Sequence, residues 1–348
     1  MKRKDFLSSS ASLFAGAVLP PLTEKIINTA DNRKTGSNIL PLIPPYLKKG
    51  DYIGITSPAG YISLEEIQPS IQLIENWGYK IKIGEAIGKR DFTFGGTDEE
   101  RARDFQNMLD DNSIKAIMCA RGGYGAIRII DKLKWDHFKT RPKWVIGFSD
   151  ITVFHSHING NLGIASIHSK MSNSFPDDWY SAGPIQAETI VSIRKALSGE
   201  EMKYTAMPNR QNKTGVVTGT LTGGNIKTIE SLAASKSDID TAGKILFVED
   251  TGEYMYSIDR MFWNLKRSGK LSQLAGLIVG GFKVKPDEDG DEFGKTLEEV
   301  VLEKVKHYHY PVCFDFPVGH QKNNFALKCG VKHKLTVQQQ QCTLTELS

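Results

Sequence analysis

A serine occupies the point where a buried strand changes into a helix. The apolar residues 144–146 form a short buried-strand pattern, Gly147 follows, and a helical pattern begins at Ile151. Ser149 on such a turn is exposed beside the first unpaired N–H groups of the helix, which suits a nucleophile. The same position suits a serine or aspartate that only caps the helix, and these residues taken alone favour the cap.

A glycine-rich turn follows the preceding strand. Residues 114–119, apolar except for Lys115, form the pattern of a strand, and Gly122-Gly123-Tyr124-Gly125 comes after them. The turn matches neither the dinucleotide nor the P-loop pattern. It could hold a phosphate at a helix N-terminus, serve only as a tight turn, or form an oxyanion hole from free backbone N–H groups. The oxyanion hole requires a nearby nucleophile, and Ser149 follows the next strand at the same edge of a parallel sheet.

A serine nucleophile also needs a base. The chain has eight histidines. His320 has the most suitable position, because it lies in a loop directly after the predicted strand 312–316. His155 and His157 lie too far along the helix after Ser149 to point back to its start, and we expect both to be structural.

The base in turn needs an acid that orients it. Glu249 ends the apolar run 245–248. A carboxylate at the end of a buried strand is costly unless it is paired, which favours Glu249 over exposed acids. Asp250, Glu253 and Asp259 remain rivals on the sequence alone.

Composition limits the other possibilities. The 348 residues are 40% apolar and 24% charged, with a net charge of +4, which indicates a globular protein of two domains and gives no basis for nucleic-acid binding. The four cysteines have no CxxC spacing, and His307 and His309 lack a third ligand. We therefore expect no metal site and no cofactor.

The N-terminus has the pattern of an export signal. A basic segment at residues 1–4, with Lys2, Arg3 and Lys4, precedes a modestly apolar stretch at 6–19, which is too short and polar for a stable membrane span. Arg3-Lys4-Asp5-Phe6-Leu7 resembles a twin-arginine signal with lysine in the second place. We expect export by a Sec or twin-arginine-like route to the periplasm. The alternative is a disordered tail on a cytoplasmic protein.

Alternating strands and helices between residues 51 and 158 predict a mostly parallel sheet with helices on both faces. A second set begins near 215 and ends with two antiparallel strands at 332–337 and 342–344, with His333 expected on the surface. The predicted organisation is a signal peptide and linker at 1–45, an α/β domain at 46–172, a connection at 173–213 and a C-terminal domain at 214–348.

Together these features resemble the LD-carboxypeptidases, the serine peptidases of the peptidase S66 type. That family includes muramoyltetrapeptide carboxypeptidases and microcin C self-immunity peptidases. The resemblance spans residues 48–337. Each motif alone is weak, but eight occur in order: Gly50-Asp51 with Ser57-Pro58; Gly96-Thr97-Asp98 with Arg101 and Asp104; Arg121 to Gly125; Gly147-Phe148-Ser149-Asp150; Gly223-Gly224-Asn225; Phe247-Val248-Glu249-Asp250; Ile258-Asp259-Arg260; and Gly319-His320.

The resemblance implies a catalytic triad. Ser149 would be the nucleophile, His320 the general base and acid, and Glu249 the acid that orients the histidine. The oxyanion hole would use the backbone N–H groups of Gly123 and Asp150, and Asp150 would also cap the helix that follows Ser149.

Two further residues are candidates for substrate binding. Arg121 could hold the terminal carboxylate of the substrate, or could instead support the glycine-rich turn through an ion pair. Asn225, in the Gly-Gly-Asn motif, is the second candidate.

The resemblance also implies an N-terminal flavodoxin-like parallel-sheet domain, a smaller C-terminal domain of the swivelling β/β/α type, an active site between them, and a homodimer. The implied reaction releases terminal D-alanine from murein tetrapeptides. Ser169-Lys170-Met171 replaces the family's frequent Gly-Pro-Met, which leaves open a peptidase or amidase acting on a peptide-nucleotide antibiotic or another acylated amine. A non-catalytic exported binding protein is the third alternative.

Overall fold

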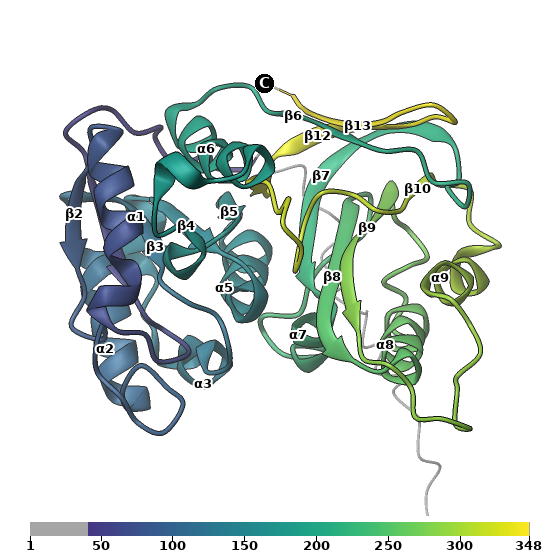
Figure 1. The fold of residues 1–348 in the computed structure, drawn as a ribbon, viewed down its shortest axis with the longest axis horizontal. Coiled ribbons are helices and arrows are strands. Elements are labelled where there is room, and N and C mark those ends of the chain that lie inside the picture. Colours follow the sequence, from purple (N-terminus) through teal and green to yellow (C-terminus); the bar gives the residue numbers. More distant parts are fainter. Residues whose placement is uncertain (1–40, 348) are drawn as a thin grey trace, which may run out of the picture. The chain divides into compact units, whose positions relative to one another are not determined.

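The structure is a computed structural model that describes residues 41–347, which belong to one compact unit. The predicted signal peptide and most of the predicted linker lie outside the described residues. The strands form two sheets, of six and seven strands, and helices flank both (Figure 1). The predicted α/β class with a parallel first sheet is confirmed. None of the helices within residues 41–347 is both long and apolar enough to cross a membrane.

The six-stranded sheet has the order β11-β5-β4-β3-β1-β2. All neighbours are parallel except β11, which runs antiparallel to β5. Its strands are β1 (Tyr52–Thr56), β2 (Lys80–Ile83), β3 (Ile114–Cys119), β4 (Trp144–Gly147), β5 (Ser166–His168) and β11 (Leu327–Cys329).

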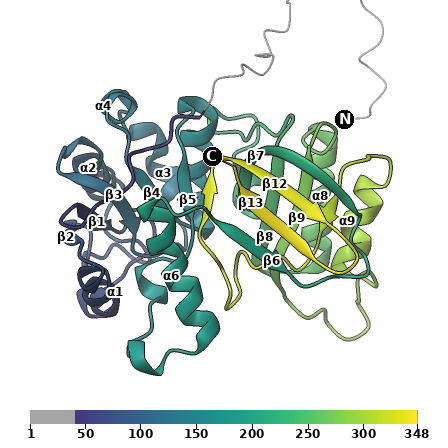
Figure 2. The ribbon, with the colours of Figure 1, turned by 90° about the horizontal axis from the view of Figure 1, so that it is seen from above.

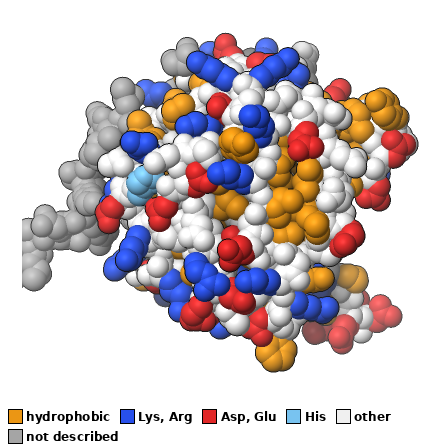
Figure 3. All heavy atoms as spheres, turned by 90° about the vertical axis from the view of Figure 1, so that its left-hand side faces the viewer, with side chains coloured by type: hydrophobic (Ala, Val, Ile, Leu, Met, Phe, Trp, Pro, Cys, Tyr) orange, Lys and Arg blue, Asp and Glu red, His pale blue; other side chains and the backbone are white. Residues whose placement is uncertain are grey.

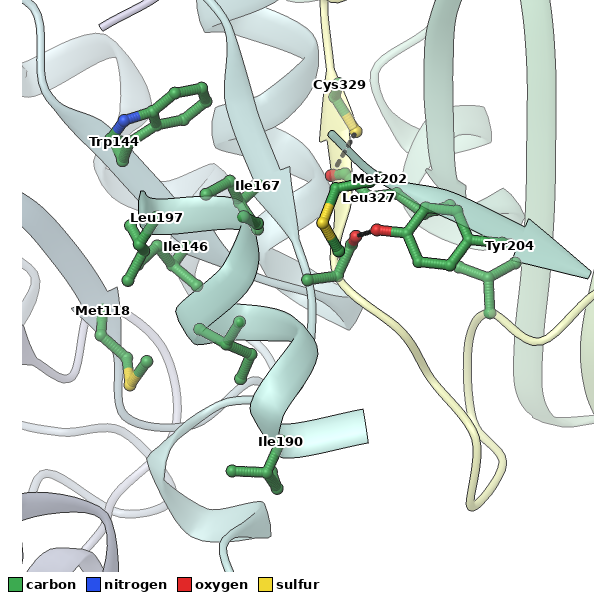
Figure 4. Close-up of a cluster of buried hydrophobic side chains, with 14 of the residues drawn as sticks. Met118, Trp144, Ile146, Ile167, Ile190, Leu197, Met202, Tyr204, Leu327 and Cys329 are labelled. Atoms are coloured by element: carbon green, nitrogen blue, oxygen red, sulfur yellow. Dashed lines mark hydrogen bonds between the residues drawn. The ribbon is translucent and has the colours of Figure 1, made fainter. Parts of the chain in front are cut away.

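Helices cover both faces of this sheet, because successive strand residues point to opposite sides. Met118 and Ile146 pack with α1 and α6, whereas their neighbours Ile117 and Val145 pack with α2 to α5. Figure 2 shows α1 and α6 on one side of the sheet and α2, α3 and α4 on the other. Figure 4 shows Ile190 and Leu197 of α6 against this core. The helices are α1 (Leu64–Asn76), α2 (Asp98–Asp110), α3 (Ala126–Ile129), α4 (Asp136–Thr140), α5 (Thr152–His157) and α6 (Pro184–Ser198).

The outer edge of this sheet is β2, on which Lys80 and Lys82 alternate with isoleucines. Lysines on an edge strand oppose pairing with another chain. Figure 3 views this side of the molecule and shows basic and acidic side chains distributed around an apolar area, so that neither sign of charge dominates this face.

The seven-stranded sheet has the order β10-β9-β8-β7-β12-β13-β6, parallel from β10 to β7 and antiparallel beyond β7. Its strands are β6 (Lys203–Ala206), β7 (Gly215–Asn225), β8 (Ile245–Glu253), β9 (Gly276–Val284), β10 (Val312–Cys313), β12 (Lys332–Val337) and β13 (Cys342–Glu346). A separate hydrophobic cluster joins its parallel part to α7 (Ile226–Ser231), α8 (Met255–Arg267) and α9 (Leu297–Val305).

The predicted surface position of His333 is wrong. Its strand, β12, lies between β7 and β13 and not at an edge. His333, Leu335 and Val337 alternate toward the interior and are fully or almost fully buried. Burial lowers the pKa of His333 to about 4, so its ring is neutral at neutral pH.

Two short strands pair with strands that the sequence analysis had placed in a different part of the predicted domain organisation. β6 comes from the predicted connection and pairs with β13, whereas β11 comes from the predicted C-terminal domain and pairs with β5 in the first sheet. Conversely, β8 extends beyond Glu249 to Glu253, and β10 is shorter than expected. The exact domain boundaries therefore stay a prediction.

Candidate active site

Ser149 is held in an unusual backbone conformation at the end of β4. Its φ angle is 63°, in the left-handed region that L-residues other than glycine seldom adopt. Such strain persists only where the surrounding structure enforces it, and it is concentrated at functional sites. The short helix that begins at Ser149 has Phe148 at its N-cap and no side-chain cap, so the helix-cap alternative for Ser149 is wrong.

The side chain of Ser149 lies against the glycine-rich turn. A Cβ atom added to Gly122 would be 3.1 Å from the Ser149 Cβ and 3.3 Å from its Oγ. Gly122 therefore leaves room for the serine side chain. The same glycine accepts a hydrogen bond at its carbonyl from the N–H of Gly60, at 2.9 Å. The turn and the nucleophile candidate are thus direct neighbours, although their sequence positions differ by more than twenty residues.

Asp150 does cap a helix, but not the one that follows it. Its Oδ2 accepts a hydrogen bond of 2.7 Å from the N–H of Ala126, the first residue of α3. The expectation that it caps the helix after Ser149 is wrong. Burial raises the pKa of Asp150 to about 6, against the opposing effects of the Ala126 hydrogen bond and nearby Arg101. The carboxylate joins the Ser149 turn to the glycine-rich turn.

Gly123 and Arg121 lie at the exposed side of the same turn. Gly123 has a φ angle of 98°, and within residues 41–347 no acceptor binds its N–H group. The Arg121 guanidinium donates to the Tyr61 carbonyl at 3.1 Å. No acidic side chain of the described residues forms an ion pair with Arg121, so the ion-pair alternative for this residue is not found.

Glu249 and His320 form a short hydrogen bond. The Nδ1 atom of His320 lies 2.5 Å from Glu249 Oε2, and the backbone N–H of His320 donates to the same oxygen at 3.1 Å. Glu249 is fully buried, whereas the histidine side chain remains 17% exposed. A carboxylate that accepts from Nδ1–H fixes the tautomer in which Nε2 is free to accept a proton.

Two of the three rival acids have other side-chain partners. Asp250 accepts hydrogen bonds from Asn225 Nδ2 and from the N–H of Lys227, and Asp259 pairs with Lys304. Burial raises the pKa of Asp250 to about 6. Of the strand-end acids, the one in contact with His320 is therefore Glu249.

Phe148 lies between Ser149 on one side and the Glu249–His320 pair on the other side of the site. Its ring centroid lies 4.9 Å from that of His320, and it directly precedes Ser149 in the chain. Within the described residues no hydrogen bond joins the Ser149 hydroxyl to His320. Catalytic hydrogen bonds of this kind are often long before substrate binds and then tighten.

Two residues close to His320 in the chain hold it in position, and the sequence analysis had singled out only the first of them. Gly319 has a φ angle of 100°, and an added Cβ atom would overlap Glu249. The fully buried Asn324 accepts a hydrogen bond of 2.8 Å from the Gly319 N–H. Gly319 belongs to a recognised motif, but Asn324 carries no sequence signal because its role depends on how the loop folds back.

Asn225 uses its side chain within the protein. Its Oδ1 caps α7 by accepting from the Thr228 N–H at 2.9 Å, and its Nδ2 donates to Asp250 at 3.1 Å. Its backbone N–H donates to Thr152 Oγ1 at 3.0 Å, which joins β7 to α5. These contacts give Asn225 a positioning role, and its expected contact with substrate stays a prediction.

The structural role expected for His155 is confirmed. Its ring nitrogens lie 2.8 Å from the Gly147 carbonyl and 2.8 Å from Ser166 Oγ, at the end of β4. Burial lowers its pKa to about 4. His157 contacts Ser237 at 2.9 Å through Nδ1. Neither histidine bonds to a residue of the predicted triad.

The chain matches two family models that together describe LD-carboxypeptidases. The N-terminal domain model matches residues 53–169, and the C-terminal domain model matches residues 218–335. The first match contains Ser149 and the glycine-rich turn, and the second contains Glu249 and His320.

Curated proteins similar to this chain carry peptidase and self-immunity names. The probable murein peptide carboxypeptidase of Bacillus subtilis is 31% identical, over 83% of this chain and 90% of that protein. The murein tetrapeptide carboxypeptidase of Pseudomonas aeruginosa is 29% identical, over 80% and 91%. The microcin C7 self-immunity protein MccF of Escherichia coli is 26% identical, over 88% and 96%.

Solved structures agree with this relationship. The muramoyltetrapeptide carboxypeptidase from Oxalobacter formigenes has a TM-score of 0.76 and 26% identity, over 85% of this chain and 99% of that one. Wild-type MccF, at 23% identity, shares the fold with a TM-score of 0.77. The chain therefore belongs to the LD-carboxypeptidase family, peptidase S66.

Proposed function

We propose that this chain is a serine-type LD-carboxypeptidase that releases terminal D-alanine from murein tetrapeptides. The bond cleaved would join an L-configured centre, of lysine or meso-diaminopimelate, to the D-alanine. Family membership and the names of the murein carboxypeptidase relatives support the substrate. The observation that carries the proposal is the hydrogen bond between Glu249 and His320. The His320 ring packs beside Phe148, and Phe148 directly precedes Ser149, whose backbone is strained.

In the proposed acylation step, Nε2 of His320 takes the proton of the Ser149 hydroxyl while Oγ attacks the carbonyl carbon of the scissile bond. The negative charge that develops on the carbonyl oxygen is stabilised by the N–H groups of Gly123 and Asp150. The C–N bond then breaks, and the imidazolium gives its proton to the departing amine of D-alanine.

In the deacylation step, water attacks the acyl group on Ser149, and His320 again accepts a proton. The proton returns to Ser149 Oγ as the ester bond breaks, and the shortened peptide leaves with a carboxylate. Throughout, Glu249 keeps the imidazole in one tautomer and stabilises its charged form. The buried setting of Glu249 strengthens this interaction because little solvent screens it.

A direct test is release of D-alanine from a defined tetrapeptide, measured by chromatography for wild type, Ser149→Ala and His320→Ala. We expect only the wild type to be active. A Ser149→Ala protein that releases D-alanine at the wild-type rate would overturn serine catalysis. A serine-directed phosphonate probe that labels wild type but not His320→Ala provides independent support, whereas absence of labelling together with tight peptide binding would favour the binding-protein alternative.

A second candidate substrate is an acylated amine of the peptide-nucleotide type. The similarity to MccF and the Ser169-Lys170-Met171 segment favour this candidate. Comparing kcat/KM for the tetrapeptide with that for an aminoacyl sulfamoyl nucleoside, at equal enzyme concentration, separates the two. A higher value for the nucleoside conjugate would replace the murein assignment.

Export to the periplasm and a homodimeric state are part of the proposal. The N-terminal signal pattern supports the first, and the family resemblance supports the second. Fractionation of cells that produce the full chain, with the same chain lacking residues 1–30 as the control, tests export. Light scattering of the purified protein tests the dimer.

A further inference from the structure

A pocket with two lysines lies beside the loop that carries His320. The pocket has a volume of about 630 Å³ and is lined by Lys170, Ser174, Lys322 and residues from the first two turns of α6. We call it the lysine pocket. No aspartate or glutamate lines it. A cavity with two cations and no lining carboxylate favours an anionic ligand.

Lys170 is the inner cation of the lysine pocket. Its Nζ donates to the Gln321 carbonyl at 2.8 Å, which uses one of its three N–H donors. No carboxylate among the described residues forms an ion pair with Lys170 or with Lys322. Burial lowers the pKa of Lys170, nearby Lys283 lowers it further, and Glu249 opposes both. An anion in the pocket would neutralise this excess of positive charge.

The lysine pocket adjoins the catalytic histidine. The Lys170 ammonium lies 5.4 Å from the centre of the Phe148 ring, and that ring lies 4.9 Å from the His320 ring. Gln321, whose carbonyl Lys170 binds, follows His320 directly. Because one peptide residue spans about 3.8 Å, a substrate held at His320 can extend a neighbouring group into the pocket.

The remaining wall suits the rest of such a ligand. Pro184, Ile185 and Ile190 offer apolar contacts for an aliphatic chain. The start of α6 has Gly183 at its N-cap and no capping side chain, so the positive end of the helix adds to the potential of the two lysines.

We propose that the lysine pocket binds a carboxylate of the peptide substrate and that Lys170 and Lys322 thereby determine specificity. The inference rests on the proposed peptidase function and names the chemistry that the site selects. A murein tetrapeptide offers this group from two sources, which are a carboxylate on the acyl side, such as that of a diaminopimelate side chain, and the terminal carboxylate of D-alanine.

The test compares Lys170→Gln, Lys322→Gln and the double variant with wild type. Three peptides are used: the diaminopimelate tetrapeptide, its lysine analogue without the side-chain carboxylate, and the diaminopimelate peptide ending in D-alaninamide. Lys334→Gln is the matched control, because Lys334 is an exposed lysine on β12 that does not line the pocket.

We expect the double variant to lose roughly tenfold in kcat/KM on the diaminopimelate tetrapeptide, mainly through KM, as removal of an interaction of about 1.4 kcal/mol would produce. Each analogue lacks one of the two carboxylates. On the analogue that lacks the carboxylate bound by the lysines, the double variant and wild type should have similar kcat/KM values, and this identifies which carboxylate the pocket binds. Equal losses on all three peptides would mean that Lys170 only supports the loop, and would overturn the proposal. No loss on any peptide would overturn it as well.

A binding measurement separates this inference from the proposed function. Calorimetric titration of the diaminopimelate tetrapeptide into Ser149→Ala, with and without the two lysine substitutions, requires no turnover. Wild type that releases no D-alanine would overturn the proposed function, whereas a dissociation constant unchanged by the lysine substitutions would overturn the lysine pocket.

Discussion

Asp150 and Ala126 are joined by a hydrogen bond of 2.7 Å that ties the Ser149 turn to the start of α3. The Asp150 carboxylate thereby links the turn after β4 to the turn after β3, at the edge of the sheet where the two turns meet. Because the bond fixes the glycine-rich turn relative to the nucleophile candidate, both halves of the predicted oxyanion hole depend on one buried carboxylate.

Asp150→Asn should change how stability depends on pH. The folded pKa of Asp150 is raised to about 6 by burial, above its ordinary value of 3.8, so the folded state holds the proton more tightly. Wild-type stability should therefore fall, relative to the variant, as pH rises from about 4 to about 6. Since one pKa unit corresponds to about 1.4 kcal/mol, the change should reach at most about 3 kcal/mol.

Urea unfolding at several values between pH 4 and pH 7 measures this difference. Asp136→Asn is the control, because the Asp136 side chain is 96% exposed and should show no comparable trend. A difference between wild type and Asp150→Asn that stays constant over this range would contradict the assigned titration.

Glu249→Gln should abolish most activity without unfolding the protein. A glutamine amide could donate to His320 Nδ1 and favour the tautomer whose Nε2 carries the proton, which cannot accept one from Ser149. We expect kcat to fall by roughly 10³–10⁴-fold with little change in KM. The readout is D-alanine release.

Glu253→Gln is the matched control for this change. Glu253 ends the same strand, β8, but does not contact His320. The assignment of Glu249 fails if its glutamine variant keeps more than a tenth of wild-type kcat, or if both variants lose the same activity.

The sequence anticipated the parts of the fold that depend on local pattern. The strand β3 has the bounds that were predicted for it, because a buried strand carries a signal in its own residues. β6 and β11 were missed because each is a short strand whose partner lies more than a hundred residues away, in β13 or β5. His333 was misplaced because flanking lysines resemble an exposed edge.

The main residues of the candidate site could be predicted from the sequence, but several of their partners could not. Strand ends and turns indicated Ser149, His320 and the glycine-rich turn, and the family motifs chose Glu249 among four acids. The helix that Asp150 caps and the bonds of Asn225 to Thr152 and Asp250 could not be read from spacing, since each of these bonds crosses between elements that only the folded chain brings together. Asn324 and the lysine pocket depend on the loop after His320 in the same way.

Gly122→Ala should reduce catalysis more than stability. The added methyl group would lie 3.1 Å from Ser149 Cβ and 3.3 Å from its Oγ and from Met171 Cε. These contacts are tight but relievable, so we expect a loss of about 1 kcal/mol in the free energy of unfolding, within the range for mild overpacking. Displacing the nucleophile by a fraction of an ångström should lower kcat by roughly 100-fold.

Chemical denaturation and D-alanine release measured on the same preparation test this separation. Gly160→Ala is the control, because an added Cβ there meets only the Asp238 carbonyl, at 3.8 Å. Wild-type activity in Gly122→Ala would show that the serine does not need the room that this glycine leaves.

Asn324→Ala should let the His320 side chain move away from the position in which it contacts Glu249. Asn324 is fully buried, and its Oδ1 accepts the Gly319 N–H, which holds the left-handed turn immediately before His320. Alanine would leave that N–H without its partner, at a cost of roughly 1–3 kcal/mol in the free energy of unfolding. Because the same turn aims His320 at Glu249, kcat should also fall, whereas KM should change less.

The neighbouring residue offers a matched control, since Asn323→Ala removes the same side chain at a partly exposed position one residue earlier. If the loop were merely sensitive to any truncation, both variants would lose activity together. The positioning role of Asn324 requires instead that kcat falls in Asn324→Ala alone, at temperatures where both variants remain folded by circular dichroism. A serine-directed probe should then label Asn324→Ala more slowly than Asn323→Ala, because reactivity of Ser149 depends on where His320 is held.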